Sequence, residues 1–113
     1  MSNQTVRWEV KDGVGIITLN RPEKRNAING DVLEGIDKAF SELSVNLEAR
    51  VLLLQGAGPA FSAGIDFNFL GTVARDDGRL PGVSLREGID RIHAIYNRIE
   101  SIEKPVVAKI HGF

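Results

Sequence analysis

The 113-residue chain contains no cysteine, and this absence removes several kinds of chemistry at once. Without a thiol there is no disulfide, no thiolate nucleophile and no metal site built on cysteine sulfur. Because a chain without cysteine can work in a reducing or an oxidising environment, the composition leaves the compartment open.

The chain also lacks an excess of charge and lacks a long apolar run. Its formal net charge is −1, which gives no reason to expect nucleic acid or an acidic membrane surface as a partner. Residues 1–5 are polar and do not resemble a signal peptide, and no apolar run is long enough to span a bilayer. We therefore expect a cytoplasmic protein that binds neither nucleic acid nor membrane.

Three familiar site motifs are missing from the sequence as well. There is no P-loop, no Gly-x-Gly-x-x-Gly and no His-Glu-x-x-His, so we expect no metal. What is present is the composition of an ordinary folded domain, 42% hydrophobic and 26% charged. The length allows one small domain.

The first half of the chain predicts a hairpin followed by a helix. Residues 6–10 alternate apolar and polar side chains, Asp12-Gly13 is a two-residue turn signal, and residues 14–19 form the partner strand. A helix is expected over residues 31–47, with Asp31 as its N-cap. Its apolar stripe comprises Leu33, Ile36, Phe40, Leu43 and Leu47.

The second half predicts a parallel crossover. Residues 51–54 are apolar throughout, as in a central strand covered on both faces. Residues 71–82 carry glycines and little periodicity, which indicates a mobile loop. A second helix is expected over residues 84–103, opened by a capping box from Ser84 to Glu87, and residues 106–110 form a strand parallel to residues 51–54.

This order of elements defines an α/β or α+β layer structure. A domain seldom ends on an uncovered apolar strand such as residues 106–110. We therefore expect residues 1–113 to be the first part of a longer domain.

The chain is organised around residues 59–66 (PAFSAGID), a small-residue loop between the strand at residues 51–54 and a new apolar run. One interpretation is a plain strand-to-helix turn with Asp66 as N-cap. The other is a site where backbone N–H groups are presented to an anion or a developing oxyanion. Spacing alone favours the plain turn.

A charged loop at residues 23–27 also allows two interpretations. A run of charges is most often a solvated connector. Lys24 and Arg25 could instead clamp a phosphorylated ligand.

Four stretches, in this order and spacing, together resemble the enoyl-CoA hydratase/isomerase (crotonase) superfamily. They are residues 14–22 (VGIITLNRP), 25–28 (RNAI), 60–66 (AFSAGID) and 104–113 (KPVVAKIHGF). The resemblance runs from Val6 to Phe113. It implies a crotonase-like spiral of β-β-α units, of which residues 1–113 would be the N-terminal part.

The resemblance also implies a substrate and a mechanism. Family members bind acyl-CoA thioesters, with coenzyme A as part of the substrate and no separate cofactor, and stabilise an enolate-like anion in an oxyanion hole of two backbone N–H groups. The first of these maps onto Ile65, and Asp66 is expected to orient the loop or cap a short helix. The residues implied to bind the substrate are Lys24, Arg25, Ala27, Ser62, Ala63, Gly64, Ile65 and Asp66.

Other parts that the resemblance implies are not in this sequence. The second oxyanion donor and the catalytic carboxylates would lie beyond Phe113, so we expect residues 1–113 alone to be inactive. Family members form trimers or dimers of trimers, so we expect a homo-oligomer. The sequence leaves open hydration or double-bond isomerisation of enoyl-CoA, and it also leaves open a non-catalytic module that binds CoA or packs in an oligomer.

Overall fold

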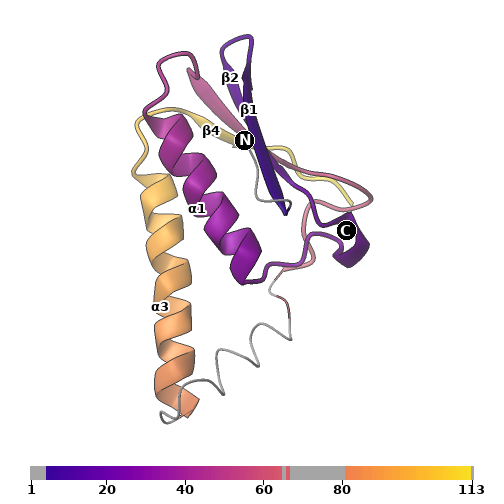
Figure 1. Ribbon diagram of the computed structural model, residues 1–113, viewed down its shortest axis with the longest axis vertical. Coiled ribbons are helices and arrows are strands. Elements are labelled where there is room, and N and C mark those ends of the chain that lie inside the picture. Colours follow the sequence, from indigo (N-terminus) through magenta and orange to yellow (C-terminus); the bar gives the residue numbers. More distant parts are fainter. Residues whose placement is uncertain (1–4, 65, 67–80, 113) are drawn as a thin grey trace.

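The computed structural model describes residues 5–64, 66 and 81–112, and Figure 1 shows how they are arranged. The described elements build one four-stranded sheet with two helices packed on it. Their bounds are β1 Val6–Lys11, β2 Val14–Leu19, the short 3₁₀ helix η1 Pro22–Lys24, α1 Gly30–Ser44, β3 Val51–Gly56, α3 Pro81–Glu100 and β4 Val106–Ala108.

The sheet has the topology that the sequence predicts. β1 and β2 form an antiparallel hairpin around Asp12 and Gly13, whose φ angles of 52° and 82° suit the residues of a tight turn. β2 pairs with β3 in parallel, and β3 pairs with β4 in parallel, with Leu52 opposite Val106. The strand order is therefore β1-β2-β3-β4, and both parallel pairs are connected through a helix.

Both helices cover the same face of the sheet and lie side by side in Figure 1. Alternate strand residues such as Trp8, Ile17 and Leu52 point to this face and pack against the apolar stripe of α1. The other face carries side chains that are exposed or half-buried, among them Leu53. β3 is central as expected, but among the described residues only one of its faces is fully covered, so the expectation of cover on both faces is wrong here.

The first turn of α1 corrects one detail of the sequence interpretation. The N-cap is Asn29, whose backbone is extended and whose side-chain oxygen accepts a hydrogen bond of 3.0 Å from the N–H of Val32. Asp31, the predicted cap, lies inside the first turn, where an acidic side chain suits the positive end of the helix dipole. Asn and Asp are both good caps, so the local sequence does not decide between them.

The last turn of α1 ends three residues earlier than predicted, at Ser44. Lys104 explains this end, because its Nζ donates to the carbonyl oxygens of Leu43 at 2.7 Å and Asn46 at 2.6 Å. The side chain of Asn46 also accepts from the N–H of Glu48, which turns the chain away from helix. Leu47 therefore leaves the apolar stripe and is 97% exposed, against the expectation that it belongs to the core.

α3 and β4 also differ from their predicted bounds. α3 begins at Pro81, three residues before Ser84, because proline suits the first turn of a helix, where its missing N–H needs no partner. The predicted loop at residues 71–82 therefore loses its last two residues to the helix, and the rest of it lies outside the described residues. β4 pairs only over Val106–Ala108, which is shorter than expected.

Replacing Lys104 by methionine tests the end of α1. We expect Lys104→Met to lower the free energy of unfolding by about 1–2 kcal/mol, because two helix-end carbonyls lose a charged donor. Urea denaturation followed by circular dichroism measures this change. Lys38→Met, on the exposed side of the same helix, is the matched control. Equal stability of the two variants would contradict the capping role.

Candidate functional site

Two loops meet at the carboxyl ends of the parallel strands β2 and β3. We name them the basic loop (residues 20–29) and the glycine loop (residues 57–64 and 66). The N–H of Ala63 donates to the carbonyl oxygen of Arg25 at 2.8 Å, and Ile28 bonds to the glycine loop on both sides. Because parallel strands end at the same edge of a sheet, segments far apart in the sequence become neighbours there.

Ile28 joins the loops through both of its backbone polar groups. Its N–H donates to the carbonyl oxygen of Gly64 at 2.7 Å, and its carbonyl oxygen accepts from the N–H of Asp66 at 2.8 Å. The described residues that the sequence assigned to the substrate thus lie on two hydrogen-bonded segments. Ile65, the predicted oxyanion donor, lies outside the described residues.

Asn26 is a further link between the loops that the sequence interpretation missed. Its side chain is 0% exposed, accepts from the N–H of Arg21 at 2.7 Å and donates to the carbonyl oxygens of Ala57 and Ala60, both at 2.9 Å. In the sequence analysis Asn26 appears only within the stretch 25–28 (RNAI) and has no role of its own. A usable signal existed, because asparagine tolerates the left-handed backbone that a tight loop requires, and here φ is +57°.

Arg21 is the second residue that the sequence interpretation missed. Its Nη1 donates to the carboxylate of Asp66 at 2.9 Å and to the carbonyl oxygen of Ala27 at 3.0 Å. The Arg21 and Asp66 side chains are only 16% and 13% exposed, so this is a largely buried ion pair. Asp66 is therefore held by its side chain as well as by its backbone. The prediction that it caps a short helix concerns residues that the structure does not describe.

The hydroxyl group of Ser62 connects the glycine loop with the basic loop. The hydroxyl donates to the carbonyl oxygen of Asn26 at 2.9 Å and accepts from the N–H of Gly64 at 3.1 Å. Gly64 has a φ of +91°, and a Cβ there would meet no described atom within 4 Å. Among the described residues, none therefore crowds the backbone at Gly64, which would allow another molecule to approach it closely.

The segment after β4 packs against the same loops, as the yellow end of the chain shows in Figure 1. The N–H of Phe61 donates to the carbonyl oxygen of His111 at 2.9 Å, and the His111 Nε2 lies 2.8 Å from the carbonyl oxygen of Gly58. A Cβ at Gly112, whose φ is +84°, would lie 2.7 Å from the carbonyl oxygen of Pro59. Only glycine fits this approach.

The predicted cationic residues lie on the outer side of the basic loop. Lys24 ends η1 and Arg25 follows it, with both side chains exposed, whereas Ala27 is half-buried. Through the bond from Ala63 to the Arg25 carbonyl oxygen, this positive charge lies next to the glycine loop. The structure thus brings two of the predicted features together at one end of the sheet.

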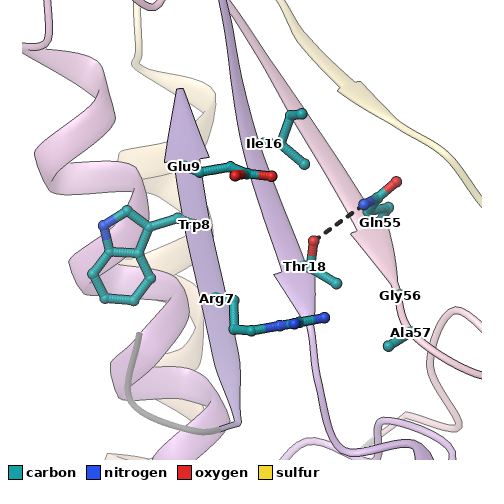
Figure 2. Close-up of a pocket in the computed structure, with 8 residues that line it drawn as sticks. All are labelled: Arg7, Trp8, Glu9, Ile16, Thr18, Gln55, Gly56 and Ala57. Carbon is teal, nitrogen blue, oxygen red and sulfur yellow. Dashed lines mark hydrogen bonds between the residues drawn. The ribbon is translucent and has the colours of Figure 1, made fainter. Parts of the chain in front are cut away.

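A hollow of about 570 Å³ lies elsewhere, on the face of the sheet opposite the helices (Figure 2). It contains none of the predicted site residues, and a hydrogen bond of 3.1 Å from Gln55 to Thr18 crosses its floor. The residues that line it are Arg7, Trp8, Glu9, Ile16, Thr18, Gln55, Gly56 and Ala57.

The described residues offer neither a metal site nor a membrane-spanning helix. Among them, no three histidine, aspartate or glutamate side chains gather closely enough to hold a metal ion. No helix in the same part of the chain combines the length and the apolar character needed to cross a bilayer.

The fold and the site define an α/β protein whose candidate site is built from loops at the carboxyl edge of a parallel sheet. A family model described as enoyl-CoA hydratase/isomerase matches residues 14–113. The chain belongs to the enoyl-CoA hydratase/isomerase family, which confirms the resemblance seen in the sequence.

Relatives in this family carry different names. The chain is 37% identical over 98% of its length to the small ribosomal subunit protein mS47 of Schizosaccharomyces pombe. It is 35% identical over 96% of its length to a peroxisomal Delta(3,5)-Delta(2,4)-dienoyl-CoA isomerase of Arabidopsis thaliana, and 32% identical over its whole length to a short-chain-enoyl-CoA hydratase of Clostridium acetobutylicum. It spans 25% of the first of these relatives and 41% of the other two.

Solved structures confirm the fold. An enoyl-CoA hydratase of Thermoplasma volcanium superposes with a TM-score of 0.83 at 33% identity, over 97% of this chain and 41% of that one. A Legionella pneumophila protein described as an enoyl CoA hydratase/isomerase (crotonase) gives a TM-score of 0.86 at 25% identity, over 98% of this chain and 41% of that one. The chain therefore has the N-terminal part of the crotonase fold.

The ion pair of Arg21 with Asp66 can be tested by a double-mutant cycle. We expect Arg21→Gln and Asp66→Asn to show a coupling energy of about 1–3 kcal/mol in urea unfolding, because each single change removes the opposite charge from beside a largely buried charged group. The exposed pair of Arg98 with Asp37 is the control, with an expected coupling below about 1 kcal/mol. Equal couplings would show that burial does not strengthen the Arg21 pair.

Proposed function

We propose that the chain is the N-terminal part of an acyl-CoA enzyme that stabilises a thioester enolate, in a hydration or a double-bond isomerisation of enoyl-CoA. The observation that carries the proposal is the pairing of the basic loop with the glycine loop. It puts two exposed cations beside the backbone of Gly64, which no other described residue crowds. A CoA thioester needs both, because its nucleotide end carries phosphates and its reacting end is a carbonyl.

The N–H of Ile65 is the oxyanion donor in this proposal. The N–H groups of Phe61, Ala63, Gly64 and Asp66 all donate to partners within the chain, so a ligand oxygen could use them only by breaking an internal bond. Gly64 and Asp66 both bond to Ile28. Ile65 itself lies outside the described residues, so its assignment as the donor rests on the resemblance.

Such a donor would act on charge that appears during the reaction. Removal of a proton beside the thioester carbonyl, or addition of water to the conjugated double bond, places negative charge on the carbonyl oxygen. A fixed N–H binds this oxygen more tightly in the transition state than in the ground state. One donor of this kind is worth about 10²–10³ in rate.

The rest of the catalytic machinery and the exact reaction remain predictions. The second oxyanion donor and an acid or base for proton transfer are expected from residues beyond Phe113, as the resemblance implies. Relatives are named as hydratases and as isomerases, which keeps both reactions within the proposal. The cytoplasmic location also remains a prediction, since relatives include a protein named as peroxisomal and another named as mitochondrial.

A second candidate function is that of a non-catalytic module in a larger assembly. The Schizosaccharomyces pombe relative, at 37% identity, is named as a ribosomal protein rather than an enzyme. The chain also exposes apolar side chains on and after the last strand, Val107 at 52% and Ile110 at 73%. Such side chains suit contact with another polypeptide.

The basic loop can be tested by binding. We expect Lys24→Ala/Arg25→Ala to weaken the binding of CoA, measured by calorimetry, by roughly tenfold, because two exposed cations no longer face its phosphates. Binding of a pantetheine thioester, which lacks the nucleotide, should stay unchanged.

Lys38→Ala/Arg50→Ala removes two exposed cations elsewhere and serves as the matched control. An equal loss of CoA affinity in both double variants would mean that net charge, and not a site, attracts the ligand.

Both candidate functions predict a chain that assembles and that is inactive by itself, and this shared expectation can be tested. We expect the purified 113-residue chain to sediment as a species heavier than one chain, because Val107 and Ile110 leave apolar surface uncovered. Analytical ultracentrifugation measures the mass, and an assay of enoyl-CoA hydration and isomerisation measures turnover. An oligomer that binds CoA without turnover fits a chain that needs further polypeptide for catalysis. A cooperatively folded monomer with full turnover would contradict both expectations.

A further inference from the structure

We propose that Asn26 is a positioning residue that sets the shape of the glycine loop. Its role in the loop follows from contacts in the unliganded chain, and only its effect on a bound thioester rests on the proposed function. The residue is wholly buried, so it does not itself face a ligand beside Gly64.

The side chain of Asn26 holds the beginning of the glycine loop. An amide has two N–H donors, and here they reach two different carbonyl oxygens, those of Ala57 and Ala60. These carbonyls bracket the turn at Gly58 and Pro59. The amide therefore fixes the width of that turn, while its oxygen accepts from the N–H of Arg21 and anchors it to the basic loop.

The backbone of Asn26 holds the end of the same loop. Its carbonyl oxygen accepts from the hydroxyl of Ser62, and this hydroxyl in turn accepts from the N–H of Gly64. Its own N–H donates to the carbonyl oxygen of Arg21 at 2.9 Å. One residue thus joins both ends of the glycine loop to the basic loop.

The packing around Asn26 leaves no room for another arrangement. A Cβ at Gly56 would lie 2.9 Å from the Asn26 Nδ2 and 2.6 Å from the carbonyl oxygen of Phe61. The backbone of Asn26, with φ of +57°, lies in the left-handed region, which asparagine adopts more readily than most other residues. Size, hydrogen-bonding pattern and backbone together match asparagine.

This arrangement has a consequence for the expected site. The N–H that would bind a thioester oxygen is a backbone group, so its place depends on the loop and not on a rotamer of its own. A shift of the loop by a fraction of an ångström would move that donor away from the oxygen, and donor geometry is what such a site supplies.

Two variants separate the backbone role of Asn26 from its side-chain role. Asn26→Gly keeps the left-handed backbone and removes the amide. Asn26→Asp keeps the size but replaces the two donors by an oxygen that faces two carbonyls. In both, we expect amide hydrogen exchange at Phe61, Ala63 and Gly64 to speed up by about fivefold or more, the factor that one lost hydrogen bond of average strength gives.

Leu43→Val, at the far end of α1, is the control for a general loss of stability. It should speed exchange throughout the sheet without singling out the glycine loop, whereas the Asn26 variants should leave exchange in β2 and β3 nearly unchanged. If the loop amides exchange as in the wild-type chain, or if all amides speed up together, Asn26 is not a positioning residue.

Infrared spectroscopy gives a second measurement, the carbonyl stretching frequency of a bound thioester. This frequency would not change in the variant if Asn26 had a purely structural role. An enoyl-CoA labelled at its thioester carbonyl should show a lowered stretching frequency when bound to the wild-type chain, and Asn26→Gly should lose this shift while keeping CoA affinity within about threefold. An unchanged shift in the variant overturns the positioning role. A wild-type chain that binds no thioester overturns the proposed function instead, and the exchange rates still decide on Asn26.

Discussion

The site depends on one constraint, that a buried amide must find partners for all of its polar groups. An unsatisfied buried donor costs about 1–3 kcal/mol, so Asn26 strongly favours the arrangement in which Ala57, Ala60 and Arg21 surround it. The basic loop and the glycine loop are thereby brought to one place. The contacts of Ser62 and Ile28 then extend this junction along both loops.

The parallel sheet makes this junction geometrically possible. β2 and β3 end at the same edge, and the segment after β4 arrives there too, where glycine at position 112 lets two backbones touch. The helices stabilise the sheet from one face, and Lys104 fixes where α1 stops. The core therefore determines the positions of the strand ends, and the loops only have to connect groups that are already close.

The sequence predicted the fold better than the site, for a physical reason. Hydrophobic periodicity is local, so the hairpin, both helices and the parallel strands could be derived from it. A distant residue decides at Leu47, which is exposed because Lys104 ends the helix before it. The start of each helix was misplaced for a local reason, since more than one nearby residue suits a helix start. The resemblance assigned substrate contacts to Lys24, Arg25, Ala27 and residues 62–66, but it gave no role to Arg21 or Asn26. The partners of these two residues in the glycine loop lie 31 to 45 positions away.

In this site the backbone is expected to contact the substrate, and side chains fix the position of that backbone. The groups expected to meet a substrate near Gly64 are backbone N–H groups, which every residue except proline carries, so side-chain identity there says little about chemistry. The side chains with irreplaceable geometry stand behind the loop, at Asn26 and Arg21, where they meet no ligand. In a site built from backbone groups, the residues that fix the loop are therefore the ones whose side chains matter. Substitutions at Asn26 and Arg21 should disturb the site more than substitutions in the loop segment that faces the substrate.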